Sequence, residues 1–158
     1  MPTLLIDDPN LLPEATVYRR VGWNHVGGVD RFEPGEKPSL SSNMFKDYPA
    51  ARAEEYGFAG PCMSVGLGYL IEEHGKTPAE AMLGNPHQGY GLVACTVGDL
   101  RALQRLNGDA CPQGIMPAPT DHEPWHAVVF DVTGKRAESV SAAIAKIACW
   151  IVPLIRAP

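Results

Sequence analysis

Short apolar runs separated by glycine and proline set the pattern of this chain, which holds 16 Gly and 15 Pro. Alternating or continuous apolar positions predict strands over residues 15–21, 39–45, 90–96 and 126–132, the last of which, HAVVFDV, is the clearest. Residues 63–74 are expected to begin extended, and their periodicity leaves open whether they end as a helix.

Helix-start and helix-stop signals predict four helices. Asp47 is a candidate N-cap for a short helix with Pro49 in its first turn and Gly57 as its stop. Residues 77–80 form the capping box TPAE, which predicts a helix that runs through Leu83.

The remaining two helices lie further along the chain. Thr96 and Asp99 are expected to open one that ends at Gly108, and the last follows a Thr133-Gly134 turn and ends at Pro153. Apolar residues at helical spacing support both predictions. In the first helix these are Leu100, Leu103 and Leu106. In the second they are Val140, Ile144, Ile147 and Ile151.

Strands and helices that mix without a regular βαβ rhythm predict an α+β fold. We expect a single compact domain over residues 15–158, in which short helices and a C-terminal amphipathic helix flank a small mixed sheet. Residues 1–14 are expected to form an N-terminal arm. A length of 158 residues suits one domain.

Composition narrows the classes of function. With 45% hydrophobic and 20% charged residues the chain has an ordinary globular composition, and its net charge of −5 argues against binding to nucleic acid. No apolar run is long enough for a membrane span, and the first residues lack the features of a signal peptide, so we expect a cytoplasmic protein that does not bind membranes. Four cysteines without CxxC spacing argue against a disulfide framework or structural zinc.

Arginine, serine and glutamate residues near residues 19–55 suggest chemistry on an anionic nucleotide. Arg19 and Arg31 offer bidentate donors for phosphate, and Ser41 and Ser42 offer hydroxyls for a ribose. A carboxylate such as Glu54 could offset the positive charge that grows when a glycosidic bond breaks. The plainer alternative is that these are solvated surface residues.

The same residues carry a resemblance to a known family. YR at residues 18–19, RFEPGEKPSLSS at 31–42 and AARAEEYG at 50–57 resemble the RES-domain family of NAD-consuming toxins, which are related to ADP-ribosyltransferases. The later segment QGIMPAPTDHEPWHAVVFD is similar to a further family segment. Positions that fall in the family's order are Arg19, Arg31, Gly35, Pro38, Leu40, Ser42, Ala51 and Glu54.

The resemblance implies an enzyme that cleaves the nicotinamide–ribose bond of NAD, by hydrolysis or by transfer. Arg19 and Arg31 would hold NAD, Glu54 would steady the ribose cation, and His126 or Thr120 would contribute to the pocket. A toxin of this kind would have an inhibitory protein partner. The sequence departs from the family at Ala118, where a serine is expected, and this departure leaves open a relative that only binds a nucleotide.

Two other classes of function are open. One is a non-catalytic nucleotide- or protein-binding domain. The other is a Cys/His hydrolase, in which Cys62 would pair with His126 and Asp131 or Asn85 would orient the histidine.

A zinc site at His122 and His126 is disfavoured. Histidines four residues apart meet on one face of a helix, but Pro119 and Pro124 argue against a helix here, so no metal is expected. The loop is instead interpreted as a ligand-facing or packing turn, with Trp125 as a stacking surface.

Overall fold

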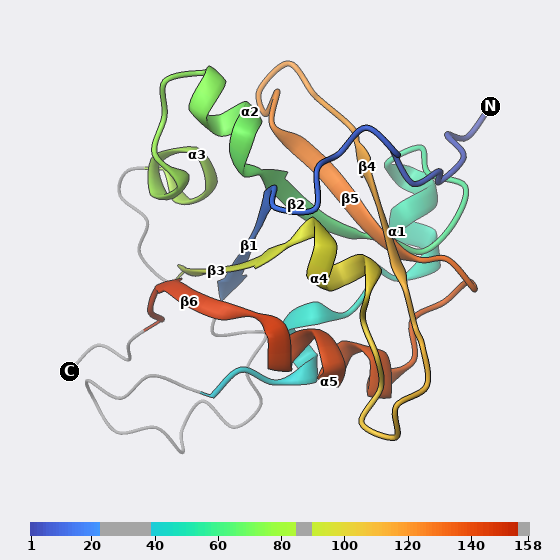
Figure 1. Ribbon diagram of the computed structural model, residues 1–158. Helices are drawn as coiled ribbons and strands as arrows, with labels where there is room; N and C mark the ends of the chain where they lie inside the picture. Colours follow the sequence, from blue (N-terminus) through green and yellow to red (C-terminus); the bar gives the residue numbers. More distant parts are fainter. Residues whose placement is uncertain (23–38, 85–89, 155–158) are drawn as a thin grey trace.

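Six strands form one sheet in the order β4-β5-β2-β1-β3-β6, and every pairing between them is antiparallel (Figure 1). The computed structural model describes residues 1–22, 39–84 and 90–154. The strands are β1 (Thr16–Gly22), β2 (Met63–Leu67), β3 (Tyr90–Thr96), β4 (Gln113–Pro117), β5 (His126–Asp131) and β6 (Cys149–Val152). The helices are the 3-10 helix η3 (Ser42–Phe45), α1 (Ala50–Glu55), α2 (Gly68–Glu73), α3 (Pro78–Leu83), α4 (Val97–Arg101) and α5 (Glu138–Ile147).

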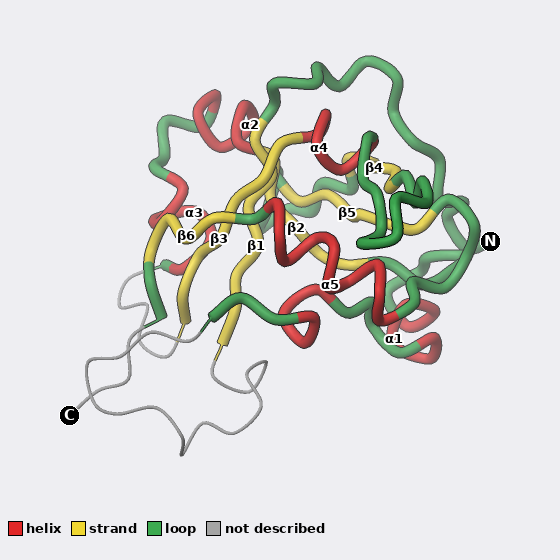
Figure 2. Tube along the Cα trace, turned by 60° about the horizontal axis from the view of Figure 1, so that its bottom comes forward, coloured by secondary structure: helices red, strands yellow, loops and turns green. Residues whose placement is uncertain are grey.

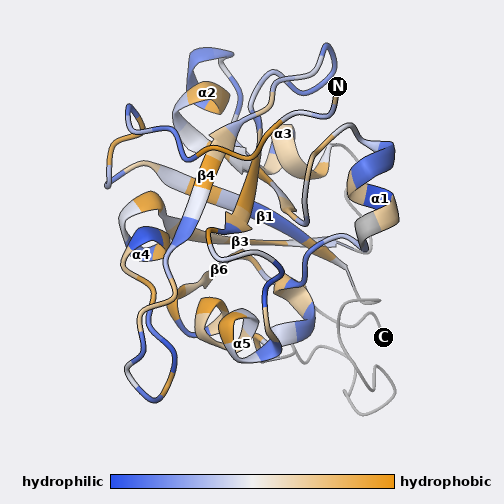
Figure 3. Ribbon diagram, turned by 90° about the vertical axis from the view of Figure 1, so that its right-hand side faces the viewer, coloured by the Kyte–Doolittle hydropathy of each residue, from blue (hydrophilic) through white to orange (hydrophobic). Residues whose placement is uncertain are grey.

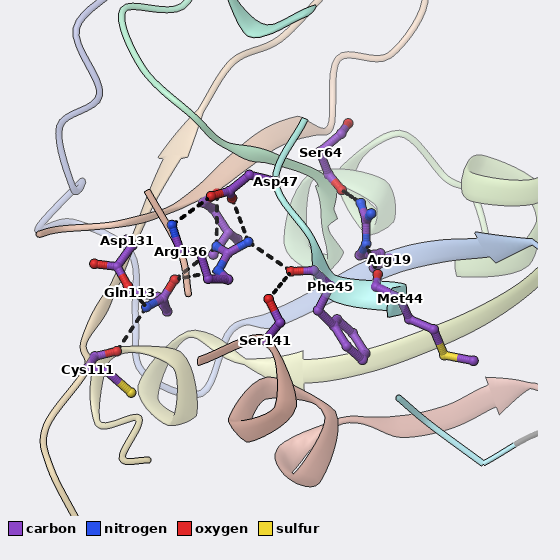
Figure 4. A network of polar contacts seen from close by, with 11 residues as sticks. Arg19, Met44, Phe45, Asp47, Ser64, Cys111, Gln113, Asp131, Arg136 and Ser141 are labelled. Carbon is purple, nitrogen blue, oxygen red and sulfur yellow. Dashed lines mark hydrogen bonds and ion pairs between the residues drawn. The ribbon is translucent and has the colours of Figure 1, made fainter. Parts of the chain in front are cut away.

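The sheet is split between its two central strands. β1 pairs with β3 over its whole length, but it pairs with β2 only at Val17–Leu67 and Tyr18–Gly66. Continuing this register would place Arg20 opposite Ser64, yet the ladder stops before that position. The Arg19 side chain crosses the gap and donates from its Nη1 atom to the Ser64 carbonyl at 2.8 Å (Figure 4). A charged side chain thus replaces the missing backbone pairing.

The two faces of the sheet are covered differently. On the face that we call the core face, Val17, Val65 and Val129 pack with residues of η3 and with Ile144 of α5. Figure 2 shows α5 running across the strands, and Figure 3 shows its apolar residues beside them, whereas α1 is largely hydrophilic. Because side chains alternate along a strand, the residues between these positions point to the opposite face, which we call the cleft face.

The cleft face has a smaller apolar cluster. Val128 and Phe130 of β5 pack there with Ala53 of α1 and with Tyr48 and Phe58 on either side of that helix. This cluster covers only part of the face. The polar cleft described below occupies the part next to the split between β1 and β2.

A buried guanidinium fixes the segment that leads from η3 to α1 (Figure 4). Arg136 donates to the Asp47 carboxylate at 2.6 Å and to the Phe45 carbonyl at 3.0 Å, and its Nε and Nη2 atoms both donate to Gln113 Oε1. Ser141 of α5 donates to the same Phe45 carbonyl. Burial lowers the pKa of Arg136 and raises that of Asp47, so desolvation outweighs the attraction between the two charges.

Most of the predicted elements are confirmed, and so is the α+β class. Residues 90–96 form β3, residues 63–74 begin as β2 and continue as α2, and residues 78–83 form α3. The capping box is present, since Thr77 and Glu80 each accept a hydrogen bond from the other's backbone N–H. Gly57, with a φ of +84°, follows α1 as the expected stop. The sheet is antiparallel where a small mixed sheet was expected.

Two expectations for the segment before α1 are wrong. The expected strand at residues 39–45 is instead an irregular segment followed by η3. Asp47 does not cap α1, because its carboxylate binds Arg136; the N-cap position belongs to Pro49.

The C-terminal helix also ends earlier than expected. It stops at Ile147, and the next residues form the edge strand β6, in which Ile151 is exposed. Similarly, α4 ends at Arg101, well before Gly108, and Leu106 is exposed.

The expected N-terminal arm, residues 1–14, packs onto the domain. Asp7 forms an ion pair with Arg101 at 3.2 Å and accepts a hydrogen bond from the Ile115 backbone N–H. Leu11 is buried in the main core. Among the described residues, no helix has the length and hydropathy required to cross a bilayer.

Arg136→Met tests the buried ion pair. Removing one partner leaves the Asp47 carboxylate buried without its counter-ion, which typically costs about 3–5 kcal/mol of unfolding free energy. We therefore expect a loss of this size in urea denaturation followed by circular dichroism. The adjacent, exposed Lys135→Met is the control and should change stability by less than about 0.5 kcal/mol.

A double variant measures the interaction between Asp47 and Arg136 separately from their other contacts. Asp47→Leu combined with Arg136→Met removes both charges, so the combined loss should be smaller than the sum of the two single losses. Equal effects of Arg136→Met and Lys135→Met would show that the ion pair does not hold the structure together.

Candidate functional site

A polar cleft with two lobes opens on the cleft face beside the split in the sheet. One lobe contains Arg19, Arg20 and Arg52, and we call it the arginine lobe. The other contains Thr120 and His126, and we call it the histidine lobe. The lobes have volumes of about 280 and 330 Å³, close to the lower end of the range for ligand pockets. Both lobes are lined by Arg20, Tyr48, Tyr56, Ser64 and Glu123.

Two arginine side chains lie against tyrosine rings in the arginine lobe. The Arg20 guanidinium lies 4.8 Å from the centre of the Tyr90 ring, and that of Arg52 lies 5.5 Å from the Tyr56 ring. The Tyr56 ring in turn lies 5.3 Å from that of Tyr48. Guanidinium groups bind phosphate and aromatic rings stack on bases, so the lobe combines both kinds of contact that a nucleotide uses.

The three arginines oppose the overall charge of the molecule. The chain carries a net charge of −5, yet the arginine lobe gathers three guanidinium groups and one carboxylate, Glu123. A cleft whose charge is opposite to that of the whole molecule concentrates anionic ligands. The cleft is therefore suited to a small anion and not to an extended polyanion.

Arg19 is half-buried, makes two structural hydrogen bonds and also lines the arginine lobe. Its Nε atom donates to the Met44 carbonyl at 2.6 Å, and its Nη1 atom donates to that of Ser64. Burial lowers the pKa of Arg19 to about 10, which still leaves the guanidinium charged at neutral pH. Arg19 consequently brings a fixed positive charge to the wall of the arginine lobe.

Ser64 and His126 form a hydrogen-bonded pair at the junction of the lobes. Ser64 of β2 lies opposite Val128 of β5, and His126 lies two residues before Val128 on the same face. The Ser64 Oγ atom is 2.6 Å from His126 Nε2. The other ring nitrogen, Nδ1, is 2.8 Å from the Ala118 carbonyl oxygen.

A tight loop between β4 and β5 presents that carbonyl to the histidine. The backbone N–H of Ala118 donates to the His126 carbonyl, and the N–H of His126 donates to the carbonyl of Glu123. Thr120 Oγ1 accepts from the Glu123 N–H at 3.0 Å. These bonds fix both the position of the imidazole and the place of Glu123 on the cleft wall.

The residues predicted from the sequence are divided between the cleft and other places. Arg19, Thr120 and His126 line the cleft, and so does Ala118, at the position where the family has a serine. Glu54 is exposed on α1 and is not part of the cleft lining. Arg31 lies outside the described residues.

Ser41 and Ser42 lie at the start of η3. Ser41 occupies the N-cap position without making a capping hydrogen bond, and its buried Oγ atom has no hydrogen-bond partner among the described residues. Ser42 is half-buried and is not among the residues that line the cleft.

The structure argues against Cys62 as a nucleophile. Its side chain is fully buried beside Val128 and Phe130, and burial raises the pKa of the thiol to about 11, so little thiolate exists at neutral pH. Asp131 does not orient His126, because its carboxylate binds Gln113 and Thr133. Asn85, the alternative, lies outside the described residues.

Trp125 and the two histidines considered from the sequence lie in the loop before β5 and at the first residue of that strand. Trp125 is buried and packs edge-on against His74, so it is a packing residue and not an exposed stacking surface. No cluster of three or more metal-ligating side chains occurs within the described residues. Both ring nitrogens of His126 are engaged by Ser64 and Ala118.

Sequence reasoning missed several cleft residues. Ser64 lies two residues after Cys62, and a lone serine in the apolar run CMSVGL was a signal that could have identified it. Glu123 and Tyr90 carry no local signal, because the hydrogen bonds of the β4–β5 loop bring the first to the cleft and the pairing of β3 with β1 brings the second. No protein-family model matches the chain, and neither a curated protein nor a solved structure shows significant similarity to it.

Thiol alkylation tests the contrast between the buried and exposed cysteines. At neutral pH, iodoacetamide should modify the exposed Cys149 first, whereas the buried Cys62 should react at least about 100-fold more slowly because burial suppresses both thiolate formation and access. Since the pKa of Cys62 is about 11, its thiolate fraction should rise only as the pH approaches that value.

Peptide mass spectrometry would measure both rates. A Cys149→Ser variant, in which the fast site is removed, is the control that identifies slow modification. Rapid labelling of Cys62 in folded protein at neutral pH would contradict the structure and revive the Cys/His hydrolase.

Proposed function

We propose that this protein binds NAD in the two-lobed cleft and cleaves its nicotinamide–ribose bond. The observation that carries the proposal is the arrangement of three arginines, three tyrosines and one glutamate around a single cleft in an otherwise acidic chain. This set supplies donors for a diphosphate, rings for a base and a carboxylate for a developing sugar cation.

The roles follow from position. Arg20 and Arg52 would hold the diphosphate in the arginine lobe, with Tyr56 or Tyr90 against a base. The ribose that carries nicotinamide would then lie near Ser64, where the two lobes meet. His126 and Thr120 would contact the nicotinamide half in the histidine lobe.

The carboxylate that suits this arrangement is Glu123. It lines both lobes, whereas Glu54 is exposed on α1 outside the lining. As the bond to nicotinamide breaks, positive charge grows on the ribose ring, and a nearby carboxylate stabilises this charge more than it stabilises the intact substrate. The proposal thus keeps the chemistry that the family resemblance implies and assigns it to a different residue.

Release of nicotinamide from NAD, followed by chromatography, tests the proposal. Arg20→Ala should reduce kcat/KM by about 10- to 100-fold, because a hydrogen bond to a charged group is typically worth about 1.5–3 kcal/mol. Glu123→Gln should reduce kcat by about 100-fold or more, since its charge acts mainly in the transition state. The exposed Lys146→Ala removes one positive charge from α5 and is the control.

The outcomes separate the candidate functions. Binding of NAD without release of nicotinamide, measured by calorimetry, would favour a non-catalytic nucleotide-binding domain. Neither binding nor release would remove NAD as the ligand. A larger loss in Glu54→Gln than in Glu123→Gln would return the catalytic carboxylate to the residue that the sequence suggested.

A further inference from the structure

The hydrogen bonds of His126 determine which ring nitrogen carries the proton. The Ala118 carbonyl oxygen can only accept, so the Nδ1 atom, 2.8 Å away, must be the donor. In the neutral ring the Nε2 atom then has a lone pair, and the hydroxyl of Ser64, 2.6 Å away, donates its proton toward it. Serine, histidine and a fixed acceptor therefore stand in the order found in hydrolytic triads, with a backbone carbonyl as the third member.

The serine is also held rigidly in an accessible place. Its backbone belongs to β2, and its carbonyl accepts a hydrogen bond from Arg19. The side chain is half-buried and lines both lobes of the cleft. A hydrogen bond that served only to join β2 and β5 would not need a position at the junction of two ligand-sized lobes.

We propose that Ser64 is a nucleophile activated by His126, and that the cleft can hydrolyse acyl esters that carry an anionic group. The arginine lobe would bind the anionic group, which places the ester carbonyl near the Ser64 hydroxyl. Arg20 lines the cleft beside Ser64, and its positive charge would stabilise the oxyanion that forms on the carbonyl. This activity does not depend on the cleavage of NAD.

The reaction takes place in two balanced steps. In the first, Ser64 Oγ bonds to the ester carbonyl carbon, its proton passes to His126 Nε2, and the alcohol leaves with that proton as the bond between the acyl carbon and its oxygen breaks. In the second, water gives a proton to His126 and bonds to the acyl carbon. Ser64 then leaves and takes the proton back, which releases the acid and restores the pair.

A fluorophosphonate probe tests the nucleophile directly, because it forms a bond to an activated serine with loss of fluoride. We expect one probe per wild-type molecule, mapped to Ser64 by peptide mass spectrometry. Ser64→Ala should not be labelled, His126→Gln should react at least about 100-fold more slowly, and Ser139→Ala, which alters an exposed serine of α5, should react as wild type.

Ester turnover is the second measurement. Wild type should hydrolyse 4-nitrophenyl succinate, whose free carboxylate suits the arginine lobe, at least about 10-fold faster than 4-nitrophenyl butyrate. Arg52→Ala, which removes a positive charge from that lobe and leaves Arg20 in place, should remove this preference. Thermal unfolding of each variant would confirm that it is folded.

Several results would overturn the proposal. These are labelling at a serine other than Ser64, equal labelling of folded His126→Gln and wild type, or no labelling of wild type at any pH. Nicotinamide release in the absence of probe labelling would leave the NAD proposal intact and remove this one.

Discussion

The buried guanidinium of Arg136 holds the segment that builds half of the cleft. Through the Phe45 carbonyl and the Asp47 carboxylate it fixes the chain between η3 and α1 against β5, and Arg19 fixes the same segment through the Met44 carbonyl. Tyr48 follows immediately, and α1 then carries Arg52 to the cleft. The ion pair does not line either lobe of the cleft, but it determines the position of Tyr48 and Arg52, which do. Desolvation makes this arrangement costly, and the cost is offset by a network in which the side chain of Gln113 takes part.

The split between β1 and β2 explains why a cleft exists in the middle of a sheet. Paired strands would fill the position with backbone hydrogen bonds, but here the ladder stops after Tyr18 and Gly66. Arg19 satisfies the Ser64 carbonyl instead, so opening the sheet does not leave that buried acceptor unpaired. The same opening exposes Ser64 and Arg20 to the cleft. Arg19 thus stabilises the central strands and also contributes a positive charge to the site.

Sequence reasoning found the elements whose signals are local. The capping box before α3 and the apolar run of β3 each depend on a few neighbouring residues, and both were predicted with correct limits. It failed where a distant partner decides the structure. Asp47 has the local features of an N-cap, but Arg136, 89 residues away, binds its carboxylate. Likewise, residues 149–152 continue a helical pattern, and it is pairing with β3 that makes them a strand.

The residues of the site also fall into those with a local sequence signal and those that depend on a distant partner. Arg19 and His126 were recognisable because arginine after an aromatic residue and histidine at a strand start are local features. The pairing of His126 with Ser64 was not, since it depends on the register of β2 against β5. The sequence pointed to Cys62, two residues from the serine that the fold presents. Cys62 lies just before β2 and is buried, whereas Ser64, two residues further on, is half-buried and lines the cleft.

The protonation of His126 tests the central claim, which is that a ligand-binding cleft contains a serine that donates to this imidazole. Nitrogen-15 NMR of the histidine rings distinguishes the two tautomers and shows whether a ligand reaches them. We expect a proton on Nδ1, an Nε2 without a proton that accepts a hydrogen bond, and a change in the Nε2 chemical shift of His126 when ADP-ribose is added. A proton on Nε2, or a His126 signal that stays unchanged at saturating ADP-ribose, would contradict it.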